Sequence, residues 1–583
     1  MAVFRKLLVS FAIFALNGIV EASPADSSQT ARAEAGGVAV NVNGDGNVVT
    51  VSLADPQVKV IVKRLMSVSL RMQKSQRAND ETLATLGRQI AEVQRAVATM
   101  VAASRQPDDD PAGRAAVDAL MTGDTRPSQD FLRRQEVDAL NRAGQKGAVG
   151  TDGVQAASNF ASEQAALLSI SNISDALQVY QRAVDYQPDD PWTLMRLGDA
   201  QVTAGKTSAA LSTFERAVEL IKPKLSSSNR YSSHTMAAAL LRIGDVLAMK
   251  GENKSALDHY QDALNLNAKS TDANVDGIGV MRNRATLYQH MGDIFVQQRE
   301  YQQAMDAYQT SLSIRQTAAD THSNELLVVL GLSSTCQKVG DLFDKKQDYA
   351  NALAYYQKAI DAGGKLSSTD ADSSIWKANL ASIHQRTANV LIDQHKRNVA
   401  FDHIRMAVDL RVQLVSEDSA NLQWKQELAF SKMKLGDLLF AERNYGRALD
   451  AYREAHALYK DVAEADTDNS DRIRWLAVSL RKKGLALTVE GEYAAALDDL
   501  GTAVFLDQKL VDHDEGNAVW QTDLALARWR LAAVESGQSV ETRIDLLQRS
   551  LKALESLQRH NKLAPDDQKY PGMVSRDLSN LMH

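Results

Sequence analysis

The chain has 583 residues, of which 44% are hydrophobic and 24% charged, which is ordinary for a folded protein in water. This length exceeds what one hydrophobic core serves, so we expect several structural units or an array of them. The formal net charge of −7 gives no reason to expect nucleic acid as the main partner. The only cysteine, Cys336, excludes an internal disulfide and a metal cluster held by several thiolates.

Residues 1–22 have the three parts of a secretory signal peptide. Arg5 and Lys6 form a basic start, an apolar run follows over 7–20, and Val20 and Ala22 stand at the −3 and −1 positions of a cleavage site. We therefore expect cleavage after Ala22 and a periplasmic or secreted bacterial protein. The alternative is an uncleaved signal anchor that tethers the chain to the membrane, although the run is shorter than a usual span. We expect no other membrane span.

Residues 23–54 combine a small, polar linker with a β-prone stretch over 38–53. In that stretch, apolar and polar residues alternate on both sides of the turn Asn-Gly-Asp-Gly-Asn at 43–47. The pattern is typical of a β-hairpin, and a lone hairpin is only marginally stable in water. The stretch therefore either pairs with copies of itself or another protein, or it is a flexible linker with transient strand character.

Residues 55–105 predict a coiled-coil helix. Apolar residues recur there at steps of three and four, which forms a narrow stripe on one side of a helix. The stripe favours a homo-oligomer built through residues 56–105, and the alternative is a helix that packs back on the rest of the chain. The polar stretch 73–82 interrupts the stripe, whose members are Val58, Ile61, Leu65, Val68, Met72, Leu83, Leu86, Ile90, Val93, Val97 and Met100.

Residues 106–156 are rich in proline, glycine and aspartate, and they predict a flexible linker. A short amphipathic piece near 131–140 is the only helical candidate in it.

A repeat organises residues 157–556. Seven small residues recur 48 positions apart: Gly244, Gly292, Gly340, Ala388, Gly436, Gly484 and Ala532. An eighth, Gly198, lies 46 positions before Gly244. We call these eight the reference positions. A second small residue follows twelve positions after each reference position, and a third follows nineteen positions after it. Between these two stands a large residue: Phe214, Tyr260, Tyr308, Tyr356, Ile404, Tyr452 or Leu500. Small residues let two helices approach closely and the large one fills the gap, so each unit is predicted to be a helical hairpin in a stacked array.

This pattern resembles the tetratricopeptide repeat (TPR), in its Leu-Gly pair (197–198), its later alanines and its tyrosine or phenylalanine. The resemblance implies an all-α fold, a right-handed α-solenoid of TPR-like hairpins that binds a protein or peptide partner. The period of 48 departs from the family's usual 34. Spacing within the hairpin is unchanged, so we expect both helices to be extended to about 20 residues, or ~30 Å. Residues 557–583 are expected to form a C-terminal tail.

A periodic pattern of charge is the candidate partner-binding site. A base stands two residues before each reference position, and an acid usually stands one residue after it. In the family, this part of the first helix lines the concave groove, so the charges could contact an extended peptide. Alternatively, each base pairs with the acid three residues later on its own helix, and no ligand is involved. This charged ladder comprises Arg196, Asp199, Arg242, Asp245, His290, Asp293, Lys338, Asp341, Arg386, Asn389, Lys434, Asp437, Lys482 and Arg530.

Other chemistry finds no support in the sequence. Residues 205–207 end like a phosphate-binding loop, but Gly198 stands too far before them and the stretch is a predicted turn between helices. The eleven histidines show no metal-binding spacing. Cys336 falls within a repeat helix, where a packed thiol is expected. We therefore predict no catalytic residues, no metal, no cofactor and no nucleic-acid partner.

Two hypotheses for function follow. The first is a non-enzymatic interaction scaffold of the bacterial cell envelope, which binds a protein through the solenoid and self-associates through its coiled coil. The second is a self-assembling structural or signalling protein nucleated by the β-prone segment 38–53.

Overall fold

The computed structural model describes residues 37–40, 49–52, 61, 92–93, 95–101, 111–122, 124–145, 151–169, 172–225, 230–268, 278–322, 326–366 and 373–583, except 466 and 468. The chain divides into two compact units, residues 1–379 and 380–583, called unit 1 and unit 2 below. The predicted signal peptide 1–22 and most of the predicted coiled coil 55–105 lie outside the described residues.

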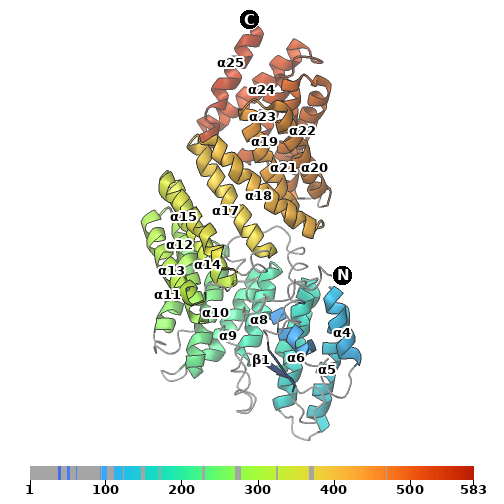
Figure 1. Ribbon diagram of the computed structural model, residues 1–583, viewed down its shortest axis with the longest axis vertical. Coiled ribbons are helices and arrows are strands. Elements are labelled where there is room, and N and C mark those ends of the chain that lie inside the picture. Colours follow the sequence, from blue (N-terminus) through green and yellow to red (C-terminus); the bar gives the residue numbers. More distant parts are fainter. Residues whose placement is uncertain are drawn as a thin grey trace. The chain divides into compact units, whose positions relative to one another are not determined.

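Nearly all described residues belong to helices that pack in hairpins along the chain (Figure 1). The helices of unit 1 are α4 (Pro111–Thr122), α5 (Arg126–Gln145), α6 (Thr151–Ser169), α7 (Ile173–Tyr186), α8 (Pro191–Thr203), α9 (Thr207–Ile221), α10 (Arg230–Met249), α11 (Asn253–Ala268), α12 (Ile278–Gln297), α13 (Tyr301–Thr321), α14 (Leu326–Lys345) and α15 (Tyr349–Asp361), with short 3₁₀ turns η1 (Lys222–Lys224) and η2 (Ala362–Lys365). The helix α17 (Ser374–Asp393) spans the boundary between the units.

Unit 2 continues the same hairpin arrangement. It contains α18 (Arg397–Glu417), α19 (Leu422–Ala441), α20 (Tyr445–Glu464), α21 (Ser470–Glu490), α22 (Tyr493–His513), α23 (Ala518–Ala532), α24 (Val540–Arg559), η3 (Pro565–Asp567) and α25 (Tyr570–Met582). The first helices of successive hairpins begin at residues 230, 278, 326, 374, 422, 470 and 518, each 48 residues after the last. Most helices from α12 onward have 20 or 21 residues, which is the length expected from the sequence.

Two short strands lie within the β-prone stretch. Strand β1 (Gly37–Val40) pairs antiparallel with β2 (Val49–Ser52), and Val38 lies opposite Val51. Whether this pair assembles with other copies stays a prediction.

The repeated glycine gives each hairpin its close helix contact. A Cβ atom added to Gly292 would lie 2.4 Å from Cε1 of Tyr308, and one added to Gly340 would lie 2.6 Å from Cε1 of Tyr356. The tyrosine ring of the second helix therefore occupies the space that a side chain on the first helix would need. Where Ala388 replaces the glycine, the residue sixteen positions later is Ile404, which is smaller across than a tyrosine ring.

The turn inside each hairpin ends the first helix with one residue in the left-handed conformation, as is common at helix C-termini. Glycine takes this position at four turns and a longer side chain takes it at four others: Gly205, Gly251, Gly491, Gly537, Arg299, Gln347, His395 and Arg443, with φ between 60° and 84°. The same turn geometry therefore recurs whether or not the residue is glycine.

The predicted flexible linker over 106–156 is wrong for residues 111–145, which form α4 and α5. The prolines that suggested a linker, Pro111 and Pro127, stand in the first turns of these helices, where proline is tolerated because no backbone N–H bond is lost. Phe131 is 1% exposed, and the fully buried carboxylate of Glu136 accepts hydrogen bonds from the Arg182 Nε atom at 2.8 Å and the Tyr186 hydroxyl at 2.8 Å. This part of the chain is therefore packed against the first repeat hairpin.

The predicted C-terminal tail 557–583 is also folded. It contains η3 and α25, and Val574 of α25 is fully buried. The indole Nε1 of Trp529 on α23 donates to Asp577 Oδ2 at 2.8 Å. The helix α25 therefore covers the last hairpin of unit 2.

One described helix, α14, is long and apolar enough by length and composition to cross a membrane, which the sequence analysis did not anticipate. Its most apolar window is 78% buried by neighbouring parts of the protein, as in the core helix of a helical array.

The close contact at Gly292 predicts a background-dependent effect of a single methyl group. We expect Gly292→Ala to lower the free energy of unfolding by about 1–3 kcal/mol, because the new Cβ overlaps the Tyr308 ring. In a protein that already carries Tyr308→Ile, the change Gly292→Ala should lower the free energy of unfolding only a little, because alanine and isoleucine then stand as Ala388 and Ile404 do in another repeat. Thermal unfolding followed by circular dichroism measures both; an equal cost in the two backgrounds would contradict the contact.

Candidate functional site

The charged ladder follows the first helices of successive hairpins, and the structure shows what its members contact. Four of its bases meet the acid of the preceding hairpin. Arg242 Nε lies 3.0 Å from Asp199 Oδ1. The other pairs of this kind are His290 Nδ1 with Asp245 Oδ1 at 2.8 Å, Lys338 Nζ with Asp293 Oδ1 at 3.0 Å, and, in unit 2, Lys482 Nζ with Asp437 Oδ1 at 2.7 Å.

The alternative of pairing along one helix does not account for these contacts. Base and acid are three residues apart and share one side of a helix, but they reach different neighbours. In α12, His290 contacts the preceding hairpin through Asp245, whereas Asp293 contacts the following hairpin through Lys338. The ladder thus joins neighbouring hairpins to one another.

A tyrosine hydroxyl supplies a second partner for four of the acids, a contact that was not predicted from the sequence. Tyr260 OH donates to Asp245 Oδ1 at 2.9 Å. The equivalent bonds are Tyr308 to Asp293 at 2.5 Å, Tyr356 to Asp341 at 2.7 Å and Tyr452 to Asp437 at 2.8 Å. A partial signal was present in the sequence: the repeats with isoleucine or leucine in place of this tyrosine carry Asn389 or Leu485 in place of the acid, whereas the repeat with Phe214 keeps Asp199.

Some of these side chains are almost completely buried, so their contacts hold the hairpins together. The His290 side chain is 5% exposed and that of its partner Asp245 is 12% exposed. Burial, and then the charge of Asp437, raises the pKa of Tyr452 well above its usual range, so this hydroxyl stays protonated and donates. Lys338 and Lys482 keep 25% and 34% of their side chains exposed, so part of the ladder also reaches the surface.

The first hairpin takes its acid from outside the repeats. Fifteen residues before Tyr180, where later units have aspartate, stands Ala165. Glu92 fills the place: the Tyr180 hydroxyl donates to Glu92 Oε2 at 2.7 Å, and Arg196 Nε lies 3.3 Å from Glu92 Oε1. The described part of the predicted coiled-coil helix therefore packs on unit 1, which was the alternative left open by the sequence, while self-association through 56–105 stays a prediction.

At two positions, before Lys434 and before Arg530, the preceding hairpin lacks the acid. Arg386 is half-buried on α17, and Asn389 on the same helix is exposed. In the hairpin that precedes Lys434, Asn389 stands where other repeats have the acid. Lys434 Nζ lies 5.6 Å from the ring centre of Phe430. The acid position before Arg530 is Leu485; the Arg530 guanidinium lies 3.9 Å from the ring centre of Trp529.

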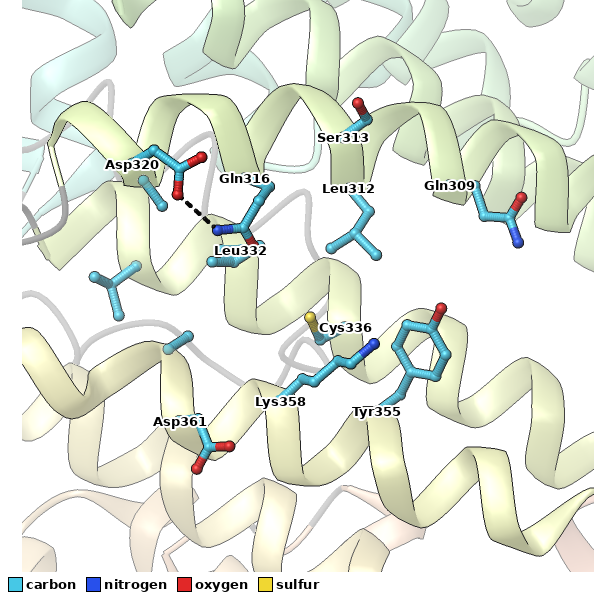
Figure 2. A pocket seen from close by; sticks show the side chains of 13 residues that line it. Gln309, Leu312, Ser313, Gln316, Asp320, Leu332, Cys336, Tyr355, Lys358 and Asp361 are labelled. Carbon is cyan, nitrogen blue, oxygen red and sulfur yellow. Dashed lines mark hydrogen bonds between the residues drawn. The ribbon is translucent and has the colours of Figure 1, made fainter.

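A second candidate site is a pocket of about 600 Å³ in unit 1, lined by α13, α14 and α15. Figure 2 shows Leu312 of α13 directed into the space, with Leu332 and Cys336 of α14 as its floor and Tyr355 of α15 on the opposite side. Polar side chains form the rim: Gln309, Ser313, Gln316, Asp320, Lys358 and Asp361. An apolar centre with a polar rim suits an apolar side chain of a partner.

This pocket and the ladder lie on different faces of α14. Cys336 lines the pocket and Lys338 belongs to the ladder, and two residues on an α-helix are about 200° apart around its axis. Burial raises the pKa of Cys336 to about 12, and the side chain is only 3% exposed. The thiol is therefore protonated at neutral pH and is a packing group, as the sequence predicted.

Among the described residues, no group of three or more histidine, cysteine, aspartate or glutamate side chains is arranged to hold a metal ion. Two histidines, His384 and His403, lie next to each other, with their Nδ1 atoms 2.9 Å apart. Burial, with the nearby His403 ring, lowers the pKa of His384 to about 4, so this pair is neutral near pH 7.

The tyrosine and lysine bonds to Asp437 predict a position-specific loss of stability. We expect Asp437→Ala to lower the free energy of unfolding by about 1–3 kcal/mol, because it leaves the buried Tyr452 hydroxyl without an acceptor. Asn389→Ala, at the exposed equivalent position in the same unit, should change it by less than about 0.5 kcal/mol. Urea unfolding followed by tryptophan fluorescence compares the two, and similar losses would mean that the bond to Tyr452 does not stabilise the unit.

Comparison with protein families matches three segments to the tetratricopeptide repeat: residues 166–224, 285–317 and 333–362. No curated protein matches the chain.

Several solved structures are similar at low identity. The quorum sensor NprR from B. thuringiensis, in its apo form, is 14% identical with a TM-score of 0.38, and the match covers 65% of this chain and 96% of that one. BtubC from P. vanneervenii is 16% identical with a TM-score of 0.34, covering 42% and 90%. YrrB, described as a TPR protein with an unusual peptide-binding site, is 15% identical with a TM-score of 0.24, covering 43% and 98%.

The matched segments lie on α6–α9, α12–α13 and α14–α15 of unit 1, where the glycine and tyrosine contacts recur. These segments of unit 1 are therefore similar to tetratricopeptide repeats, modules that typically mediate protein–protein interaction.

Proposed function

We propose that the protein is a non-enzymatic interaction scaffold of the bacterial cell envelope, which holds a protein or peptide partner along the first helices of its hairpins. The observation that carries the proposal is the interlocked ladder. Ion pairs and tyrosine hydrogen bonds tie several first helices to the next one, as between His290 and Asp245 or Lys482 and Asp437. Such ties fix the spacing of the first helices, and a preformed surface loses little conformational entropy on binding.

The exposed fractions of the ladder side chains indicate which of them a partner could contact. His290 is almost completely buried, so it is a poor candidate for contact with a partner. Lys338, Lys482 and Asp437 keep between a quarter and a third of their side chains exposed, so these are the better candidates. The partner surface is therefore proposed to include the accessible edge of the ladder, together with exposed neighbours such as Asn389.

Export to the envelope is supported by the sequence of residues 1–22, and self-association by the apolar stripe in 56–105. The competing function, assembly nucleated by segment 38–53, is supported by the pairing of β1 with β2.

The scaffold proposal predicts where a partner cross-links. We expect a photo-reactive amino acid at Asn389, which is exposed on the first helix α17, to capture a partner in cells that export the full chain. The matched control is Met406, which is 48% exposed on the second helix α18 of the same unit, and it should capture no partner. Equal yields at both positions, or none at either, would contradict binding along the first helices.

The two modes of self-association predict different outcomes of deletion. We expect the mass of the full chain, measured by light scattering, to be unchanged when residues 36–54 are removed. Replacing Leu86 and Ile90 by glutamate should reduce the mass to that of a monomer, because charges in an apolar seam oppose pairing. Loss of assembly on deletion, with no effect of the charges, would favour the β-nucleated function instead.

A further inference from the structure

The ladder has an incomplete end in unit 2. At four positions its cation is met by a carboxylate of the preceding hairpin, as Lys482 is by Asp437. At the N-terminal end, where the repeat supplies Ala165, a carboxylate from outside the repeats, Glu92, takes that place. Before Arg530 the repeat supplies Leu485, and no described residue places a carboxylate within ion-pair distance of this guanidinium.

A pocket of about 310 Å³ opens at this position. It is lined by α21, by α23 and by the segment that leads from α24 to α25. Five cations line it, from three different parts of unit 2: Arg474, Arg481, Lys482, Arg530 and Lys562.

Two of the arginines share one carboxylate, that of Asp523. It accepts hydrogen bonds from Arg474 Nε at 2.7 Å on Oδ2 and from Arg481 Nη2 at 3.0 Å on Oδ1. The buried Asp507 also interacts with Arg481, and because burial raises the pKa of its carboxyl to about 7, it is only partly ionised near neutral pH. Lys482 is paired with Asp437, so the positive charge that these carboxylates do not offset lies mainly on Arg530 and Lys562.

The other side of the pocket carries the uncompensated charge. The structure pairs neither Arg530 nor Lys562 with a carboxylate among the residues of unit 2 that it describes. Burial lowers the pKa of Arg530, and Tyr570 and Asp577, whose charges would raise it, do not offset the effects of burial and of the neighbouring Arg481. Asp567 is the remaining acid of the lining, and its pKa is raised, mainly by burial.

We propose that this pocket binds an acidic side chain of an extended peptide segment in the protein partner. The carboxylate pairs with Arg530 and Lys562 and completes the ladder at this end, as Glu92 does at the other. An arginine fork next to a lysine suits a carboxylate, and charge-assisted hydrogen bonds are strong in a partly buried site.

The walls of the pocket add a preference for what flanks the acid. Leu485, Leu526 and Tyr570 are among its lining residues, so an aliphatic side chain next to the carboxylate finds apolar contacts. A volume of about 310 Å³ is at the lower end for ligand pockets, which fits one or two side chains and not a large cofactor. The inference rests on the proposed scaffold function and names the chemistry of the partner.

The test uses the full chain and a fluorescein-labelled peptide of alternating glutamate and leucine, with blocked ends. Fluorescence anisotropy should show binding of this peptide and none of the matching glutamine and leucine peptide. Arg530→Gln and Lys562→Gln should each weaken binding by about tenfold or more, the effect of losing one charge-assisted hydrogen bond. Arg559→Gln and Lys552→Gln, which change exposed cations of α24 outside the pocket, should leave it unchanged.

A second variant separates binding from folding. Leu485→Asp places the missing acid of the ladder on the hairpin before Arg530, so the protein itself should neutralise the cation. We expect this variant to fold with a thermal midpoint at or above that of the wild type and to lose peptide binding. Unchanged binding in Leu485→Asp, or equal binding of the glutamate and glutamine peptides, would overturn the proposal.

Two further outcomes distinguish related ideas. Displacement of the peptide by inorganic phosphate as readily as by unlabelled peptide would mean a small-anion site and would overturn the peptide assignment. If Asn389 captures a partner equally well in Arg530→Gln and wild type, the scaffold function stands and the pocket proposal fails. If nothing is captured at Asn389 but the glutamate peptide binds through Arg530, the pocket stands without the proposed partner surface.

Discussion

The structure depends on a carboxylate shared between neighbouring hairpins. In the repeated form of the contact, an aspartate on a first helix accepts a hydrogen bond from the tyrosine of its own hairpin and pairs with a cation of the next, as Asp293 does with Tyr308 and Lys338. One group thus closes a hairpin and stacks it on its neighbour. A buried carboxylate that lost either partner would be costly, so each hairpin is specified by the next as well as by itself.

The glycine before that aspartate sets the geometry in which the shared carboxylate works. Without a Cβ atom at Gly292 the ring of Tyr308 lies directly on the first helix, and this brings its hydroxyl to Asp293. Asn389 and Ile404 replace the acid and the tyrosine in one repeat, as Leu485 and Leu500 do in another, so acid and tyrosine are lost together in these two repeats. A solenoid built in this way has fixed spacing between its first helices, which is the property that a binding surface needs.

At the two ends of the array a hairpin lacks a neighbour, so residues outside the repeats contact it instead. At the beginning, Glu92 supplies the carboxylate that the first hairpin lacks, and α4 and α5 cover the hairpin's outer side through the buried Glu136. At the other end, α25 covers the last hairpin, but a cation of the ladder faces a basic pocket. End repeats of solenoids usually differ in sequence because one side has no neighbour. Here Glu92 supplies the missing carboxylate at the first end. At the other end the place next to Arg530 is the one that we assign to a carboxylate of the partner.

The sequence by itself determined the repeat unit, its helical hairpins, their extended length and the close contact at each reference glycine. These follow from periodicity, which records local geometry directly. It did not determine the partners of the ladder, because sequence spacing cannot tell whether His290 faces Asp293 on its own helix or Asp245 on the neighbouring hairpin. It also misjudged 111–145 and 557–583, where prolines and the end of the repeat pattern suggested a linker and a tail. Only the tertiary structure decided these points, since burial of Glu136, the place of Glu92 and the pocket at Arg530 all depend on contacts between residues far apart in the chain.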